Sequence, residues 1–191
     1  MHGPAMSGWL LVALCAASGA YCLLRVRSGP GEERGAAGGE AVMGFGMAAM
    51  ALPAAVVPPP PWAWQVYAAV FGAAALRALW ALGALRAARL PSGAAHHLHH
   101  LVGSLAMLYM AVAMAPDGGA HAGHGRAGGV PLLTGALLVY FAVFVLRAGA
   151  RLVPVAAPAG GGTVAWGARP ELALACRVSM GVAMVAMLLT V

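Results

Sequence analysis

The sequence predicts an all-α fold: a polytopic membrane protein built as a six-transmembrane-helix bundle with both termini outside the cell. The first observation behind this prediction is composition, since hydrophobic residues make up 62% of the 191 residues and charged residues only 8%. Soluble domains are about half apolar and a quarter charged, so this chain cannot cover a water-facing surface. The second observation is the length of the apolar segments, and the third is the distribution of arginine between them.

Six apolar segments approach the ~20 residues that a helix needs to cross the hydrocarbon core. They lie at about residues 8–24, 41–58, 62–85, 97–115, 130–146 and 171–191. Only helices and closed barrels can span lipid, and the segments lack the period-two alternation of strands. Proline and glycine clusters separate them, which is typical of loops. We therefore expect a single integral membrane domain over residues 1–191. A kink is expected at Pro53, which removes the helical hydrogen bond to the Ala49 carbonyl.

The start of the chain lacks the features of a cleaved signal peptide, which carries positive charge ahead of its apolar stretch. The opening letters MHGPAMSGWLL contain no arginine or lysine, and Arg25 and Arg27 follow the apolar stretch instead. This order favours a retained first helix with its N-terminus outside.

The eleven basic residues are all arginines, and they are divided unequally between the loops. The first, third and fifth loops hold Arg25, Arg27, Arg34, Arg86, Arg89, Arg147, Arg151 and Arg169. The second loop holds none and the fourth only Arg126. By the positive-inside rule the arginine-rich loops face the cytoplasm, which in a bacterium places the protein in the plasma membrane. The arginines are scattered singly and form no stripe, so no nucleic-acid partner is expected.

Nine of the eleven methionines fall on the second, fourth and sixth segments, which run in the same direction. Each set follows the i, i+3/i+4, i+7 spacing of one helix face. The sets, which we call the methionine stripes, are Met43, Met47 and Met50; Met107, Met110 and Met114; and Met180, Met184 and Met187. We expect Met47, Met107 and Met184 to face one another near the middle of the bundle.

Two interpretations of the methionine stripes remain open. Methionine is flexible and packs well beside the small residues of a stretch such as MGFGMAAM, where helices approach closely. Its thioether sulfur is also a soft donor that selects Cu(I), and three striped helices could present sulfur sites at successive depths. The first interpretation needs no cofactor, whereas the second makes copper the candidate.

Four of the seven histidines lie in HHLHH, residues 96–100, at the cytoplasmic start of the fourth segment. Ser92 is a suitable N-cap, which puts His96 and His100 on one helix face in about the second turn. Imidazoles at i, i+4 can chelate a metal, and the positive helix N-terminus favours their neutral, metal-binding form. The alternative is a polar anchor at the membrane interface, with His97 and His99 facing lipid headgroups.

Further ligands for such a metal can be named from the sequence. Glu40 or Cys176, which begin the neighbouring methionine stripes, would supply a third ligand to the histidine pair. Towards the outer surface, the soft ligands would continue through His2, Met6, His121 and His124.

Two arginines lie inside the apolar segments. Arg77 and Arg177 each stand about two turns from the cytoplasmic end, and their long side chains are expected to snorkel to that surface. The alternative is an ion pair with Glu40 or Glu171, which would help to set the register of the bundle.

The sequence carries no enzyme motif: no glycine-rich phosphate loop, no HExxH, no CxxC and no paired intramembrane carboxylates. A b-type haem would require His100 with a methionine, because a second intramembrane histidine is missing, so haem is a less favoured alternative. We expect a non-catalytic membrane bundle or accessory subunit in the lipid bilayer, associated with an unidentified membrane protein or a second copy of itself. Copper binding or transport, through the stripes and the histidine pair, is the alternative function.

The histidine-rich helix start followed by MLYMAVAM, together with MGFGMAAM and MGVAMVAM, resembles an uncharacterised actinobacterial family of integral membrane proteins, a domain of unknown function. The likeness extends over most of the chain. It implies a membrane fold and location, and it supplies no activity, cofactor or substrate. It also implies a histidine ahead of the methionine run on several helices, and here Glu40 and Arg177 stand at two of those places.

Overall fold

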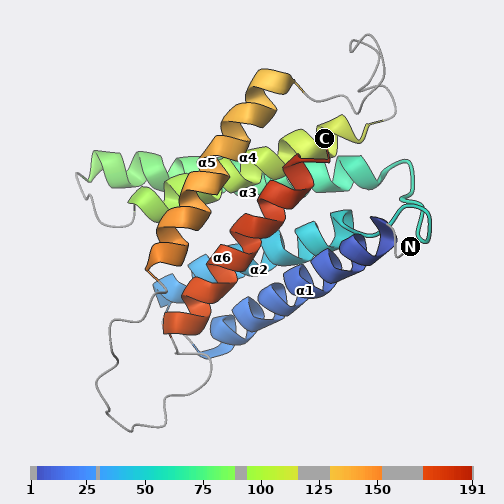
Figure 1. The fold of residues 1–191 in the computed structure, drawn as a ribbon. Helices are drawn as coiled ribbons and strands as arrows, with labels where there is room; N and C mark the ends of the chain where they lie inside the picture. The colour runs from blue at the N-terminus through green and yellow to red at the C-terminus, as the bar shows by residue number, and fades with distance from the viewer. Residues whose placement is uncertain (1–3, 29–30, 89–93, 116–129, 152–169, 191) are drawn as a thin grey trace, which may run out of the picture. The chain divides into compact units, whose positions relative to one another are not determined.

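The computed structural model describes residues 4–28, 31–88, 94–115, 130–151 and 170–190, which form helices and turns with no strand among them. In chain order the helices are α1 (Pro4–Ser28), α2 (Gly31–Met50), α3 (Ala63–Ala87), α4 (Ala94–Ala113), α5 (Pro131–Ala150) and α6 (Pro170–Leu188) (Figure 1). Each helix overlaps one of the six apolar segments of the sequence. The predicted all-α class is therefore confirmed.

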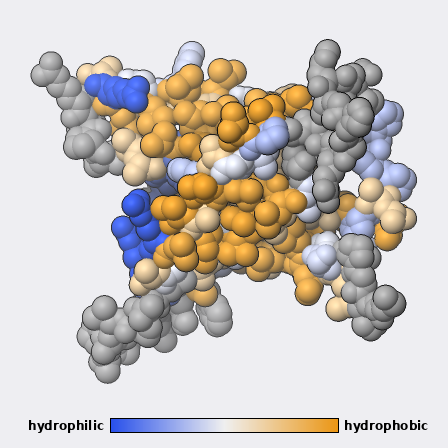
Figure 2. All heavy atoms as spheres, turned by 45° about the horizontal axis from the view of Figure 1, so that its top comes forward, coloured by the Kyte–Doolittle hydropathy of each residue, from blue (hydrophilic) through white to orange (hydrophobic). Residues whose placement is uncertain are grey.

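Four of these helices are long and apolar enough to cross a membrane: α1 over Met6–Arg27, α3, α5, and α6 over Glu171–Leu188. The other two fall short because they open with polar residues, GEER in α2 and the histidine run in α4. Apolar side chains cover most of the face seen in Figure 2, and strongly hydrophilic residues lie at its margins. Apolar surface of this extent is compatible with a membrane protein. The six-span count and the outside location of both termini stay predictions.

Helix α2 differs from its predicted segment at both ends. It begins at Gly31 rather than near residue 41, and it ends at Met50 rather than near residue 58. Pro53 explains the early end, since proline has no N–H and disfavours helical backbone in the residue before it. Ala51 still donates to the Met47 carbonyl at 2.9 Å, after which the regular helix gives way to turns. The predicted kink at Pro53 is therefore wrong, because the helix stops before the proline.

The helices group into two compact units. The first unit holds α1, α2, α6 and α5 from Gly135 onward, and the second holds α3, α4 and the first turn of α5. Within the first unit α1 packs along α2 and contacts α6, and within the second unit α3 packs along α4 (Figure 1). The single domain over residues 1–191 stays a prediction.

Glycines set the distance between α1 and α2. A Cβ atom added to Gly44 would lie 2.9 Å from the Gly19 Cα and 3.1 Å from the Cys15 carbonyl oxygen. A Cβ atom added to Gly19 would lie 3.2 Å from the Phe45 backbone nitrogen. The 2.9 Å distance is shorter than Cβ atoms normally approach another atom, so a side chain at Gly44 would force the helices to shift. The two backbones therefore touch where these glycines meet.

The α3–α4 pair is built differently, from side chains buried at helical spacing. The larger buried residues are Phe71 and Leu82 on α3 and Met107 and Met110 on α4, with alanines between them. By contrast, the α3 glycines Gly72 and Gly83 have no atom within 4 Å of an added Cβ.

Tyr109 ties α4 to the start of α5. Its hydroxyl oxygen lies 2.7 Å from Thr134 Oγ1 and accepts a hydrogen bond from the Val130 backbone N–H at 2.7 Å. Val130 stands directly before Pro131, the first residue of α5, where backbone N–H groups lack acceptors within the helix. The Tyr109 hydroxyl therefore accepts a hydrogen bond from the Val130 N–H, which has no acceptor within the helix.

Candidate functional site

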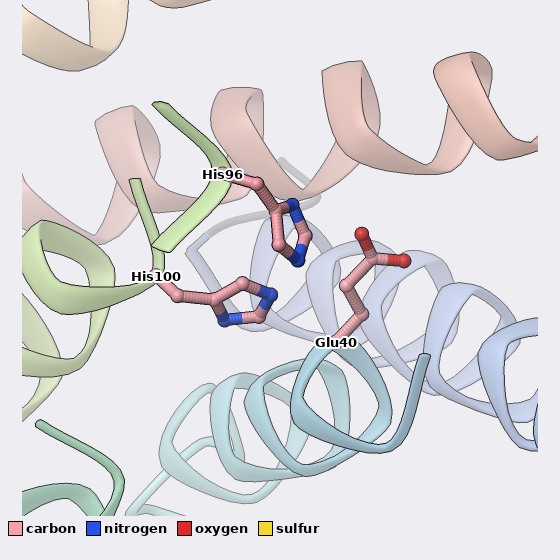
Figure 3. A group of neighbouring side chains, drawn as sticks. All are labelled: Glu40, His96 and His100. Carbon is pink, nitrogen blue, oxygen red and sulfur yellow. The ribbon is translucent and has the colours of Figure 1, made fainter. Parts of the chain in front are cut away.

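Glu40, in the middle of α2, is the one buried charged residue among those the structure describes (Figure 3). Its Oε1 accepts a hydrogen bond from Arg177 Nε of α6 at 2.8 Å. Its Oε2 accepts one from Arg25 Nη1 of α1 at 3.2 Å. An unpaired carboxylate is costly to remove from water, so the two guanidinium groups make the burial of Glu40 possible.

Polar side chains continue from Glu40 along the contact between α1 and α6. Cys22 Sγ donates to Glu40 Oε2 at 3.6 Å, and one turn away Ser18 Oγ lies 2.8 Å from Ser179 Oγ. Ser179 Oγ also donates to the Cys176 carbonyl at 2.8 Å. We call this group the polar seam; its members are Ser18, Cys22, Arg25, Glu40, Arg177 and Ser179.

The local sequence explains why the polar seam forms. Ser18, Cys22 and Arg25 follow one another at i, i+4 and i+7, which places them on one face of α1. Ser18 finds its partner on α6, and Cys22 and Arg25 find theirs on α2, so the polar seam joins α1, α2 and α6 of the first unit. Chemically it is an ion triad with a hydrogen-bonded extension, and it sets the register of three helices.

The structure distinguishes the two arginines that the sequence places inside apolar segments. Arg177 makes the ion pair with Glu40, so the pairing alternative is confirmed for it. Its side chain nevertheless remains 38% exposed, so part of the guanidinium reaches the surface. Arg77 is exposed on α3, and its snorkelling to the cytoplasmic surface stays a prediction.

The histidine pair lies on α4 as its spacing predicts. The rings of His96 and His100 are in edge-to-face contact with centroids 4.6 Å apart. Figure 3 shows the two side chains beside each other on α4. A ring nitrogen of each lies within 4.8 Å of one of the other, and both side chains are partly exposed. The pair can therefore offer two nitrogen ligands from a single helix. Glu40 and Cys176 belong to the first unit and His96 and His100 to the second, so a third ligand from either stays a prediction.

Most of the methionine stripes are buried. Met47 and Met107 have no exposed surface and Met184 has 1%, so none of these three points away from the protein. Met43, Met110, Met180 and Met187 are also buried. Met50 is partly exposed, and Met114, at 42%, lies largely outside the core. Mutual contact of all three stripes stays a prediction.

Several predicted residues lie outside the described residues or away from any site. Met6 is described and is 53% exposed. The outer histidines His2, His121 and His124, the expected N-cap Ser92, and the loop arginines Arg89, Arg126 and Arg169 lie outside the described residues.

Sequence reasoning missed three parts of the structure. Arg25 was used only as an indicator of topology, although it is a direct partner of Glu40. The Ser18–Ser179 contact and the Tyr109 hydroxyl were not anticipated. Each had a signal, because a polar group inside an apolar helix needs a partner when it is buried.

The described residues form six helices, four of them long and apolar enough to span a bilayer. The fold is therefore compatible with a helical membrane protein. Residues 32–191 match the domain of unknown function DUF5134, and the chain belongs to this family. The predicted resemblance to a domain of unknown function is thus confirmed, while actinobacterial origin and histidine- and methionine-rich helices as family features stay predictions. No curated protein and no solved structure matches the chain.

Proposed function

We propose that the protein is a non-catalytic helical bundle of a bacterial plasma membrane, acting as an accessory subunit for a membrane protein or for a second copy of itself. The observation that carries this proposal is the state of the buried polar groups. Among the described residues, no buried side-chain nitrogen or oxygen lacks a hydrogen-bond partner. Such mutual pairing is what a polar group inside a structural bundle requires.

The same pairing supports a transmembrane location for α2. Its first half carries charge, and an uncompensated carboxylate at membrane depth would oppose insertion. Glu40 instead meets two cations from α1 and α6, so α2 can enter lipid as part of the first unit. This pairing supports a span at α2 and hence the proposed six spans. The proposed orientation, with both termini outside and the arginine-rich loops in the cytoplasm, rests on the distribution of arginine alone.

Cysteine accessibility tests the proposed topology. In a variant whose three native cysteines are replaced, Ser92→Cys should be protected from a membrane-impermeant maleimide in intact cells, and Gly119→Cys should react. Labelling of both after lysis is the control for reagent access. The opposite pattern would reverse the orientation, and equal labelling of both sites in intact cells would remove the intervening span at α4.

Copper binding is the second candidate, and the arrangement of α4 favours it. His96, His100, Met107, Met110 and Met114 recur at intervals of three, four and seven residues, so the histidine pair continues the face that buries Met107 and Met110. Imidazole nitrogen and thioether sulfur both suit Cu(I). Such a face would pass the ion from nitrogen ligands at the helix start to sulfur ligands further along.

Metal analysis after copper loading separates the two candidates. His96→Ala/His100→Ala should lower the copper stoichiometry if the pair binds the ion, and His97→Ala/His99→Ala is the matched control. Protons compete with a metal for imidazole, so such binding should weaken below about pH 6, near the ordinary histidine pKa of ~6.5. Copper that remains bound at pH 5 but disappears when all nine stripe methionines become leucine would assign it to the thioethers. No bound copper in the wild type would leave packing as the role of the stripes.

A further inference from the structure

The polar seam has more positive than negative charge. One carboxylate, Glu40, holds two guanidinium groups, those of Arg25 and Arg177, so the triad keeps one net positive charge. The carboxylate is the buried member, with 5% of its side chain exposed, whereas Arg25 is 17% and Arg177 38% exposed. The excess charge is therefore carried by the two groups that reach the surface.

Glu40 engages only some of the hydrogen-bond donors of these arginines. A guanidinium has five N–H donors, and Glu40 engages Nε of Arg177 and Nη1 of Arg25. Since no buried side-chain nitrogen among the described residues lacks a partner, the remaining nitrogens are bonded elsewhere or accessible. Glu40 thus holds each guanidinium at one nitrogen and does not itself engage the other donors.

The position of this pair along the helices points to a ligand. Arg25 lies in the last turn of α1, and Arg177 lies seven residues after the first residue of α6, roughly 10 Å along the helix axis. An arginine side chain can extend over that distance towards the headgroup layer. Planar guanidinium groups are suited to bidentate contacts with phosphate oxygens.

We propose that Arg25 and Arg177 form a binding site for the headgroup phosphate of an anionic phospholipid, with Glu40 as the residue that positions both guanidinium groups. This inference rests on the proposed membrane location of α1 and α6, and it adds a specific lipid to that location. An anionic lipid is favoured over a zwitterionic one because the triad keeps a net positive charge that a phosphodiester without a compensating cation neutralises.

Lipid retention measures the site directly. The full-length protein would be reconstituted in vesicles of phosphatidylcholine and phosphatidylglycerol at 3:1, extracted in mild detergent, and analysed by native mass spectrometry for bound lipid. Wild type should retain phosphatidylglycerol in preference to phosphatidylcholine. Arg177→Lys keeps a cation for Glu40 but loses the paired N–H donors of the planar guanidinium. Its apparent affinity for phosphatidylglycerol should therefore fall about tenfold, the size of one lost charge-assisted hydrogen bond. Arg147→Lys, on an exposed arginine near the end of α5, is the control and should match wild type.

Three outcomes would overturn the proposal. These are equal retention of the two lipids by wild type, unchanged retention by Arg177→Lys, and an equal decrease in Arg147→Lys. Arg25→Lys provides a second variant if Arg177→Lys does not fold. Displacement of the lipid by inorganic phosphate, but not by chloride at the same ionic strength, would reassign the site to a free phosphate. Recovery of the wild type outside the membrane fraction of cells would instead refute the proposed membrane location. This measurement distinguishes a failure of the proposed location from a failure of the lipid site.

Discussion

The α1–α2 pair and the α3–α4 pair are both helical hairpins of consecutive segments, yet different interactions hold them together. In the first, the backbones touch at Gly19 and Gly44 and a buried carboxylate is paired with arginine. In the second, the buried residues are mostly alanines and large apolar side chains, with Gly103 and Ser104 among them on α4. The α3 glycines Gly72 and Gly83 have no close neighbour. Water-driven burial contributes little between helices in lipid, so close backbone contact and polar pairing stabilise more than additional apolar area does. We therefore expect the α1–α2 pair to be the more sensitive to single substitutions.

The largest effect is expected at Glu40. Glu40→Ala leaves Arg25 and Arg177 without their carboxylate and should lower the free energy of unfolding by about 3 kcal/mol, at the lower end for a broken buried ion pair because both arginines are partly exposed. Unfolding by sodium dodecyl sulfate in mixed micelles would measure it. Glu33→Ala, at an exposed position of the same helix, should change stability by no more than about 0.5 kcal/mol. Equal effects of the two variants would show that Glu40 is not paired.

The next effect tests the glycine contact. Gly44→Ala places a methyl group 2.9 Å from the Gly19 Cα, and separating the helices should cost about 1–2 kcal/mol after the gain in helix propensity. Gly72→Ala in α3 meets no atom within 4 Å and should be neutral or stabilising by up to about 1 kcal/mol. Changes of opposite sign in the free energy of unfolding of the two variants would support close backbone contact in the α1–α2 pair and its absence at Gly72 of the α3–α4 pair. A stabilising Gly44→Ala would refute it.

A smaller effect is expected from the hydroxyl that joins α4 to α5. Tyr109→Phe removes the contacts with Thr134 and the Val130 N–H and should cost about 1 kcal/mol. Hydrogen exchange of the Val130 N–H, directly before α5, should also accelerate, because it loses its acceptor. Tyr67→Phe on α3 is the control, and a similar loss there would show that the effect does not depend on the contacts that the Tyr109 hydroxyl makes.

The smallest effect is expected at the exposed end of the methionine stripes, and its comparison with a buried position separates packing from metal binding. Met47→Leu nearly conserves volume at a fully buried position and should cost less than about 1.5 kcal/mol. Met114→Leu, at a position 42% exposed, should stay within about 0.5 kcal/mol. Thermal unfolding with and without added Cu(I) distinguishes the two roles. A copper-dependent shift that Met47→Leu abolishes would show a ligand role beyond packing.

The helices themselves could be predicted from the sequence, but their ends were less accurate. An apolar run reports which residues prefer lipid, whereas a helix continues through polar residues as long as its backbone bonds are satisfied. Helix α2 shows both errors, since it begins ten residues before the apolar run and ends where Pro53 imposes a limit. Helix α1 likewise continues through Arg25 and Arg27 to Ser28.

The candidate site was only partly predictable. A sequence shows which residues share a face of one helix, but it does not show which helix packs against that face. The His96–His100 pair lies four residues apart and was expected to share a face, as it does. Glu40 and Arg177 are separated by 137 positions, and the choice between pairing and snorkelling could not be made from them alone. Ser18 and Ser179 are 161 positions apart and carried no local pattern. Contacts of this kind depend on helix register, which only the packed structure supplies.

The order of the first four helices has a consequence for biosynthesis. Helices α2 and α4 are not among the four that are long and apolar enough to cross a membrane, and each directly follows one that is and packs along it. We therefore expect the chain to leave the translocon as hairpins, α1 with α2 and then α3 with α4, so that each strong helix carries its weaker neighbour. Arg25 emerges fifteen positions before Glu40, whereas Arg177 follows it only 137 positions later. For most of synthesis, then, Arg25 is the one arginine of the triad available to Glu40, and Arg177 completes the triad only when α6 arrives.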